Sequence, residues 1–176
     1  YITISDANGR KGIDKLTHAG NAGTQASIDA LYDLYGFKAD YFMKLNFDGC
    51  VNIVDALGGI TIDSEVEFTN GEDAAPENYH FVKGLNECDG AMTLAFVRER
   101  QCFMNGDFQR GRNQQAAISG IINKATSPSV LTSYSSVLEA ATEVLYTNMP
   151  TSMITGLIKD QLADSTPWNV QSYAVS

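Results

Sequence analysis

Four of the five arginines in this 176-residue chain lie within one fifteen-residue stretch, at Arg98, Arg100, Arg110 and Arg112. The planar guanidinium group stays protonated and can bind two phosphate oxygens at once. Arg98 and Arg100 are two residues apart, so an extended backbone would project both from one face. Arg110 and Gln114 are four apart and would share one face near a helix N-terminus, where free backbone N–H groups also favour anions. The spacing favours a site for phosphate or pyrophosphate.

The charge of the whole chain limits what this cluster can bind. The formal net charge is −9 and the pI is about 4.5, which argues against nucleic acid as a partner because its backbone requires a basic surface. A small concentrated basic patch on an acidic chain suits a small polyanion. The alternative is that the arginines only pair with surface carboxylates, and composition alone leaves that alternative open.

Cysteines and histidines offer weaker signals. Cys50, Cys88 and Cys102 show no CxxC or paired Cys/His spacing, which argues against a zinc site. A Cys88–Cys102 disulfide and three buried free thiols are equally compatible with the sequence. His18 fits a hydrogen-bonded structural residue better than a general base, and His80 is predicted to be solvated.

Paired carboxylates occur at Glu65 and Glu67 and again at Glu72 and Asp73. Such pairs can serve as the acid and base of a glycoside hydrolase. Their place in an acidic stretch without periodicity favours a solvated surface instead.

Apolar spacing predicts alternating helices and strands, and this alternation is typical of an α/β fold. We expect a layered α-β-α domain with a central mixed sheet flanked by helices. Residues 65–87 lack periodicity and are predicted to form a long surface loop with at most short strands. Helices are predicted over 24–35 with Thr24 as N-cap and Gly36 just past the end, 49–57, 89–98 with Asp89 as N-cap, 107–127, 134–145 and 153–162. Strands are predicted over 41–47, 60–62 and 168–175.

Several motifs occur in an order that resembles the LytR-CpsA-Psr family, in particular its capsule and wall-polymer attachment branch. The resemblance covers nearly the whole chain, so 1–176 is expected to be a single catalytic domain of that family. The domain's N-terminal strands and extreme C-terminus are expected to lie outside the chain. The motifs are Lys15 to Gly20, Lys44 to Phe47, Val54 to Ile60, Phe96 to Arg100, Gly106-Asp107 with Arg110 to Gln115, and Gln171 to Val175.

The resemblance implies a phosphotransferase outside the cell that moves a glycan polymer from a polyprenyl pyrophosphate carrier to peptidoglycan. The polymer would be wall teichoic acid, capsular or a related polysaccharide. Arg98, Arg100 and Arg110 match the family's catalytic arginines and, with Gln114, its pyrophosphate site. Arg112 is a lesser candidate for that site. The alternative is a non-catalytic module that binds lipid pyrophosphate or wall polymer.

The chain departs from the family pattern at its start. In the family, aspartates that hold Mg²⁺ and a further essential arginine precede the segment that begins here at Tyr1. The Mg²⁺ ligands and a membrane anchor are therefore expected upstream, and no metal site is expected in this chain. Asp107 could orient an arginine or cap the helix that follows it, and the cap is the preferred prediction. The apolar helices could line a lipid tunnel or form ordinary core, and periodicity does not separate the two.

Overall fold

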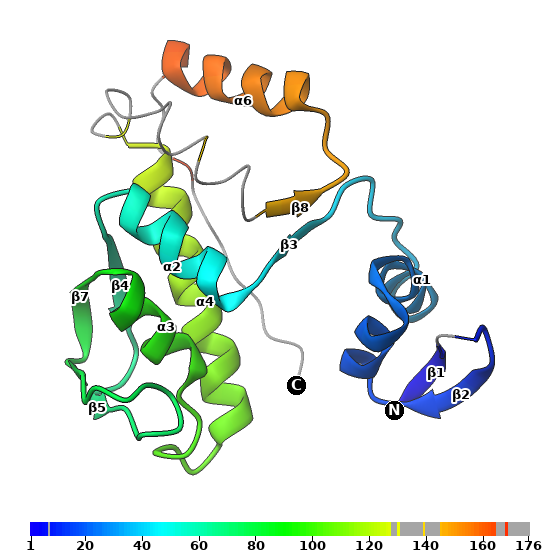
Figure 1. The fold of residues 1–176 in the computed structure, drawn as a ribbon, viewed down its shortest axis with the longest axis horizontal. Coiled ribbons are helices and arrows are strands. Elements are labelled where there is room, and N and C mark those ends of the chain that lie inside the picture. The colour runs from blue at the N-terminus through cyan, green and yellow to red at the C-terminus, as the bar shows by residue number, and fades with distance from the viewer. Residues whose placement is uncertain (7, 128–129, 131–138, 140–144, 165–167, 169–176) are drawn as a thin grey trace. The chain divides into compact units, whose positions relative to one another are not determined.

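The computed structural model describes residues 1–6, 8–127, 130, 139, 145–164 and 168. They fall into two compact units, residues 1–42 and 43–176. Helices and strands both contribute substantially (Figure 1), and the predicted α/β class is confirmed. The expectation of a single domain over 1–176 stays a prediction.

The first unit is a β-hairpin with a helix beside it. The two strands pair antiparallel from Ile2 opposite Asp14 to Ser5 opposite Lys11. A small core is formed by Ile4, Ala19 and Ala30. The elements are β1 (Ile2–Ser5), β2 (Lys11–Asp14), the 3-10 helix η1 (Leu16–Ala22) and α1 (Thr24–Tyr35).

Helix α1 ends where the sequence predicts, just before Gly36. It begins at Thr24, the residue predicted to be its N-cap. Gly36 closes it in the left-handed conformation, at φ 72°, which glycine adopts without strain. Gly23 occupies the N-cap position, so the prediction of Thr24 as N-cap is wrong. Gly23 has φ 110°, a backbone conformation that threonine rarely adopts.

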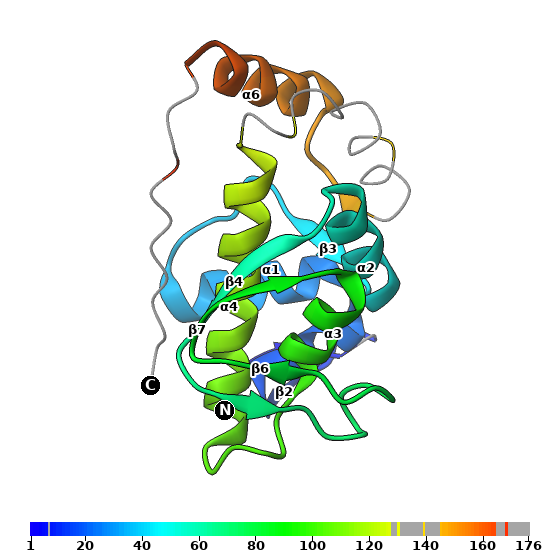
Figure 2. The ribbon, with the colours of Figure 1, turned by 90° about the vertical axis from the view of Figure 1, so that its left-hand side faces the viewer.

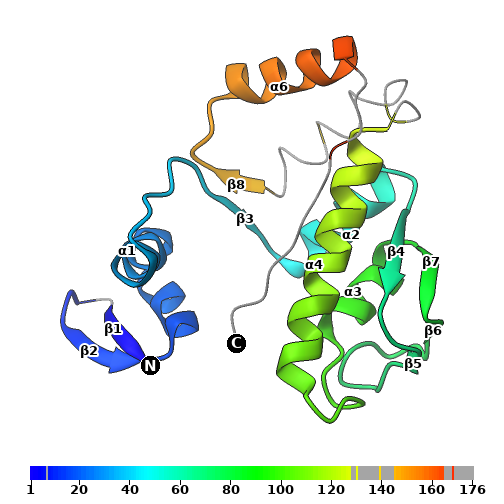
Figure 3. The same cartoon turned by 180° about the vertical axis from the view of Figure 1, so that it is seen from behind.

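The core of the second unit packs helices against an antiparallel strand pair. Strand β4 (Ile60–Ser64) confirms the strand predicted at 60–62 and pairs with β7 (Gly84–Cys88), as Figure 2 shows. Helix α4 (Gly106–Ala125) runs alongside β4 (Figure 3). A Cβ on Gly120 would lie 2.7 Å from the Thr61 carbonyl oxygen, so only glycine permits this close approach.

Two shorter helices complete this core. Helix α2 (Phe47–Ala56) begins two residues before its predicted start because Asn46 caps it, accepting the Gly49 N–H at 2.8 Å. Helix α3 (Gly90–Arg98) begins at its predicted cap, since Asp89 accepts the Met92 N–H at 2.8 Å.

The remaining elements of this unit are β3 (Met43–Leu45), β8 (Leu145–Thr147) and α6 (Thr151–Asp164). Strands β3 and β8 pair antiparallel, so Leu145 lies in a strand and not in the helix predicted over 134–145. The rest of that predicted helix lies almost wholly outside the described residues. So does the strand predicted over 168–175, apart from Trp168. Helix α6 confirms the helix predicted after Pro150.

The prediction that residues 65–87 form a surface loop is wrong for two phenylalanines of this segment, which are buried. This segment contains β5 (Phe68–Thr69) and β6 (His80–Phe81), which place Phe68 and Phe81 in the core. Their ring centroids lie 4.9 Å apart, and each also contacts the ring of Phe96. Strands of two residues are too short to produce an alternating pattern, so periodicity could not reveal them.

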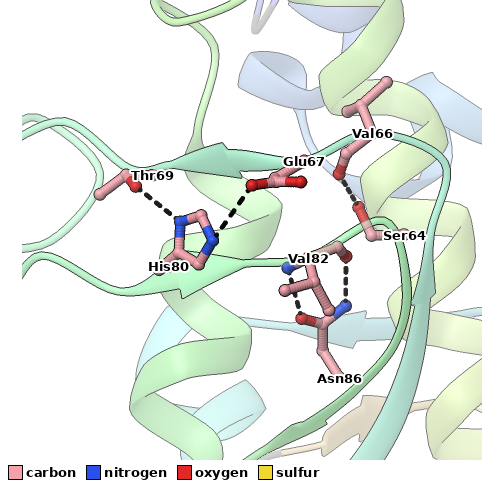
Figure 4. A network of polar contacts seen from close by, with 7 residues as sticks. All are labelled: Ser64, Val66, Glu67, Thr69, His80, Val82 and Asn86. Atoms are coloured by element: carbon pink, nitrogen blue, oxygen red, sulfur yellow. Dashed lines mark hydrogen bonds and ion pairs between the residues drawn. The ribbon is translucent and has the colours of Figure 1, made fainter.

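Polar contacts hold the same segment together (Figure 4). The Asn86 side chain accepts the Val82 N–H at 2.9 Å and donates to the Val82 carbonyl at 2.9 Å. His80 is exposed, as predicted, and contacts Thr69 at 3.0 Å and Glu67 at 3.4 Å. These contacts fix the loop that carries Phe81 into the core.

The strands of the described residues lie in four separate antiparallel pairs: β1–β2, β3–β8, β4–β7 and β5–β6. The single central mixed sheet expected from the sequence is not seen among these residues, because each strand has one neighbour there. No helix in the described part of the chain is long and apolar enough to span a membrane.

Candidate functional site

The first two arginines lie where α3 ends. Arg98 is the last residue of the helix, and Glu99 has φ −59° and ψ 132°, which takes the backbone out of the helical conformation. Arg98 and Arg100 therefore flank an extended residue. This is the arrangement that the two-residue spacing predicts, and both side chains line the same pocket.

Arg110 and Gln114 lie one turn apart on α4, in its N-terminal half, and line that pocket as well. Close packing fixes the start of this helix. A Cβ on Gly106 would lie 2.5 Å from the Arg100 carbonyl oxygen, so a glycine is needed where α4 meets the arginine-bearing loop.

Asp107 does not cap α4, and that prediction is wrong. Asn105 occupies the N-cap position and makes no side-chain cap bond. Asp107 lies in the first turn, where the helix dipole favours a carboxylate, and its Oδ1 lies 3.0 Å from Arg110 Nη2 and 3.9 Å from Arg100 Nη1. Asp107 therefore bridges arginines from the two segments.

The pocket between these segments has a volume of about 460 Å³ and brings together Arg98, Arg100, Arg110 and Gln114. Three guanidinium groups and one side-chain amide therefore line the same pocket, as the sequence predicts. The other residues that line it are Phe47, Gly71, Asp73, Ala74, Val97, Glu99 and Gln101.

Contacts to neighbouring groups orient two of the side chains. Arg98 Nη2 donates to the Asp73 carbonyl at 3.1 Å, and its guanidinium carbon lies 5.3 Å from the centroid of the Phe47 ring, within the range of a cation–π interaction. Gln114 Nε2 lies 3.5 Å from the Val97 carbonyl. These contacts leave further guanidinium N–H groups of Arg98 able to bind an anion.

Arg112 is not part of this pocket, although the sequence made it a lesser candidate. Its Nε lies 3.2 Å from a Glu65 carboxylate oxygen, and its side chain lines a different groove of about 1240 Å³ beside β4 and α4. Two residues on a helix are separated by about 200° of rotation, so Arg110 and Arg112 point away from each other. Glu65 is a surface ion-pair partner, which agrees with the solvated role predicted for the carboxylates.

Glu99 is a site residue that the sequence did not reveal. Its side chain is 2% exposed, and its carboxylate accepts backbone N–H groups at 2.6 to 3.0 Å. Burial raises the pKa of this carboxyl, but the N–H donors outweigh that effect and hold the pKa below its ordinary value. No sequence pattern marks such a residue, because all of its partners are backbone groups. The donors are the N–H groups of Gly71, Arg100, Gln101 and Cys102.

This lowered pKa predicts a pH-dependent contribution to stability. Glu99 should stabilise the fold fully above the ordinary carboxyl pKa of about 4.3, and the contribution should disappear as pH falls through the lower folded-state pKa. Urea unfolding of the wild type and Glu99→Gln should differ by about 2 kcal/mol at pH 7. The difference should shrink steadily as pH is lowered below about 4. A difference that stays constant with pH would contradict the assignment of a buried carboxylate.

The described residues offer no metal centre. They contain no group of three or more His, Cys, Asp or Glu side chains that could hold an ion. Of the carboxylates that line the pocket, Glu99 binds backbone N–H groups and Asp73 binds the Gln101 side chain. A ligand set for the Mg²⁺ that the resemblance leads us to expect is not seen among these residues, and the requirement for Mg²⁺ stays a prediction.

The contacts of His18 and of the three cysteines fit structural roles. His18 Nδ1 lies 2.9 Å from Asp14, in agreement with the structural role predicted for it. All three cysteines are free, with Cys88 buried and Cys102 exposed. Burial, aided by neighbouring carboxylates, raises the pKa of Cys88 to about 12. Partial shielding from water, together with the nearby Glu99 carboxylate, raises the pKa of Cys102 to about 11, so neither thiol is ionised at neutral pH.

Known proteins have sequences similar to this chain. The model of the LytR-CpsA-Psr family matches residues 1–176. The polyisoprenyl-teichoic acid–peptidoglycan teichoic acid transferase TagU of Bacillus anthracis is 32% identical over 148 residues, which are 84% of this chain and 47% of TagU. The chain thus spans about half the length of the curated relatives it matches.

Solved structures are similar as well. The crystal structure of Bacillus subtilis TagU matches with a TM-score of 0.67 at 30% identity, over 90% of this chain and 64% of that one. That of B. subtilis TagV matches with a TM-score of 0.75 at 22% identity, over 93% and 62% of the two chains, and this likeness concerns the fold alone. With its motifs, its pocket and a family match over its whole length, the chain belongs to the LytR-CpsA-Psr family.

Proposed function

We propose that this chain forms the pyrophosphate-binding part of a transferase at the outer face of the cell membrane. The enzyme would move a glycan polymer from a polyprenyl pyrophosphate carrier to peptidoglycan. One observation carries the proposal: Arg98, Arg100, Arg110 and Gln114 converge on a single pocket from two different segments. The teichoic acid transferase name of the TagU relatives supports it.

The chemistry of the transfer explains why arginines are needed. A hydroxyl oxygen of the acceptor forms a bond to the phosphorus that carries the glycan and gives up its proton to a base. The bond from that phosphorus to the bridging oxygen breaks. The bridging oxygen leaves with the polyprenyl phosphate and gains negative charge in the transition state. Fixed guanidinium groups around the pyrophosphate stabilise that charge and hold the two phosphorus atoms in place.

We also propose that the reaction requires Mg²⁺, as the family resemblance implies. The metal would neutralise pyrophosphate charge. The carboxylates that line this pocket are engaged elsewhere, so its ligands would come from outside the described residues. The residues described here contribute binding and orientation of the anion.

A transfer assay tests the function directly. The protein that carries this chain at its natural full length is incubated with polyprenyl-pyrophosphoryl glycan, peptidoglycan and Mg²⁺, and glycan bound to peptidoglycan is measured. We expect transfer, and we expect Arg98→Ala to lower its rate at least tenfold, since a charge-assisted hydrogen bond contributes roughly 1.5–3 kcal/mol. Pyrophosphate binding without any transfer would instead support the non-catalytic module.

A further inference from the structure

We propose that Glu99 is a positioning residue, which holds together two walls of the arginine pocket without touching the bound anion. One wall is the segment 98–101 that carries two of the arginines, and the other is the turn 71–74. The identity of the anion rests on the proposed function above, whereas the joining of the two walls does not.

The carboxylate of Glu99 uses one oxygen for each wall. Oε1 accepts the N–H groups of Arg100 at 2.7 Å, Gln101 at 2.6 Å and Cys102 at 3.0 Å. Oε2 accepts the N–H of Gly71 at 2.6 Å, across 28 residues of sequence. A single side chain therefore fixes the backbone just after α3 and anchors it to the turn.

Two side-chain contacts also join these two walls. Arg98 donates to the Asp73 carbonyl at 3.1 Å, and the Gln101 side chain donates to the Asp73 carboxylate. The turn itself is closed by the Ala74 N–H, which donates to the Gly71 carbonyl at 3.0 Å. Releasing Gly71 from Glu99 would free the turn and, with it, the acceptor that orients Arg98.

The contacts require a carboxylate and not an amide. Four N–H groups point at two acceptor oxygens, and an amide offers one acceptor oxygen and an NH₂ group that only donates. In Glu99→Gln, either the Gly71 N–H or the three N–H groups of residues 100–102 would face a donor. None of the ion pairs among the described residues involves Glu99, so its charge is balanced by these backbone groups and not by the arginines.

The test compares Glu99→Gln with Glu72→Gln, which removes a carboxylate from the exposed neighbour of Gly71 in the same turn. Amide hydrogen exchange measures the joining of the walls, and calorimetric titration with inorganic pyrophosphate measures the site. In Glu99→Gln we expect protection of the Gly71, Gln101 and Cys102 amides and pyrophosphate affinity each to fall about tenfold. Glu72→Gln should change neither quantity.

A further control separates positioning from general stability. Ile62→Val trims a fully buried side chain of β4 that does not line the pocket, and it should lower global stability while pyrophosphate affinity stays unchanged. If Glu99→Gln unfolds the chain, Glu99→Asp replaces it; this variant keeps both oxygens on a shorter arm and should bind with intermediate affinity.

The outcomes are distinct. The proposal would be overturned if the folded Glu99 variant kept the pyrophosphate affinity and the amide protection of the wild type. An equal loss of affinity in Ile62→Val would overturn it as well. If the wild type binds no pyrophosphate yet Glu99→Gln loses protection at Gly71 and Gln101, the proposed function fails and the joining role of Glu99 stands.

Discussion

Replacing Arg110 by alanine is expected to weaken pyrophosphate binding about 100-fold, because a charged guanidinium that makes two hydrogen bonds to an anion contributes roughly 2–3 kcal/mol. Arg110 lies in the N-terminal half of α4, and Asp107 holds its guanidinium at 3.0 Å. Calorimetric titration of the wild type and the variant with inorganic pyrophosphate measures the loss. The thermal midpoint should stay unchanged, because an exposed ion pair contributes little to stability.

The matched control is Arg112→Ala. It removes the same charge from the same helix, but Arg112 pairs with Glu65 and lines the other groove. We expect its affinity for pyrophosphate to match that of the wild type at physiological salt. An equal loss in both variants would mean that overall charge, and not the pocket, attracts the anion.

Replacing Phe96 by alanine is expected to lower the free energy of unfolding by about 3–5 kcal/mol, the cost of removing a fully buried aromatic ring. The Phe96 side chain is completely buried, and its ring centroid lies 5.1 Å from that of Phe81 and 5.5 Å from that of Phe68. Equilibrium unfolding in urea measures the difference.

Phe108→Ala provides the comparison for this variant. Phe108 lies on α4 and its side chain is 62% exposed, so its loss should cost less than about 1 kcal/mol. Equal destabilisation in the two variants would contradict the placement of Phe96 in the core. That placement matters for the site, because α3 carries Phe96 two residues before Arg98 and the Phe96 carbonyl accepts the Asn113 side chain at 3.2 Å.

The elements that the sequence predicted well have strong local signals. Asp89 caps α3 and Gly36 ends α1, since each residue type favours those positions independently of the rest of the fold. Phe68 and Phe81 were missed because two-residue strands leave no periodic pattern, and only the packing of distant segments buries them. The pairing of strands likewise depends on contacts between segments far apart in sequence.

Part of the candidate site could likewise be predicted from the sequence, and part could not. The convergence of Arg98, Arg100 and Arg110 could be predicted, since backbone periodicity decides which side chains share a face. The same periodicity places Arg112 on another face of α4, which shows that density of charge alone is a poor guide. Glu99 could not be predicted, because nothing in a sequence indicates which carboxylate will bind backbone N–H groups.

The most direct test of the pyrophosphate site is a crystal structure of the protein with pyrophosphate bound. We expect the anion in the pocket between α3 and α4, with its oxygens within hydrogen-bond distance of Arg98, Arg100 and Arg110. A pyrophosphate bound beside Arg112 in the other groove, with the three arginines still unliganded, would contradict the account.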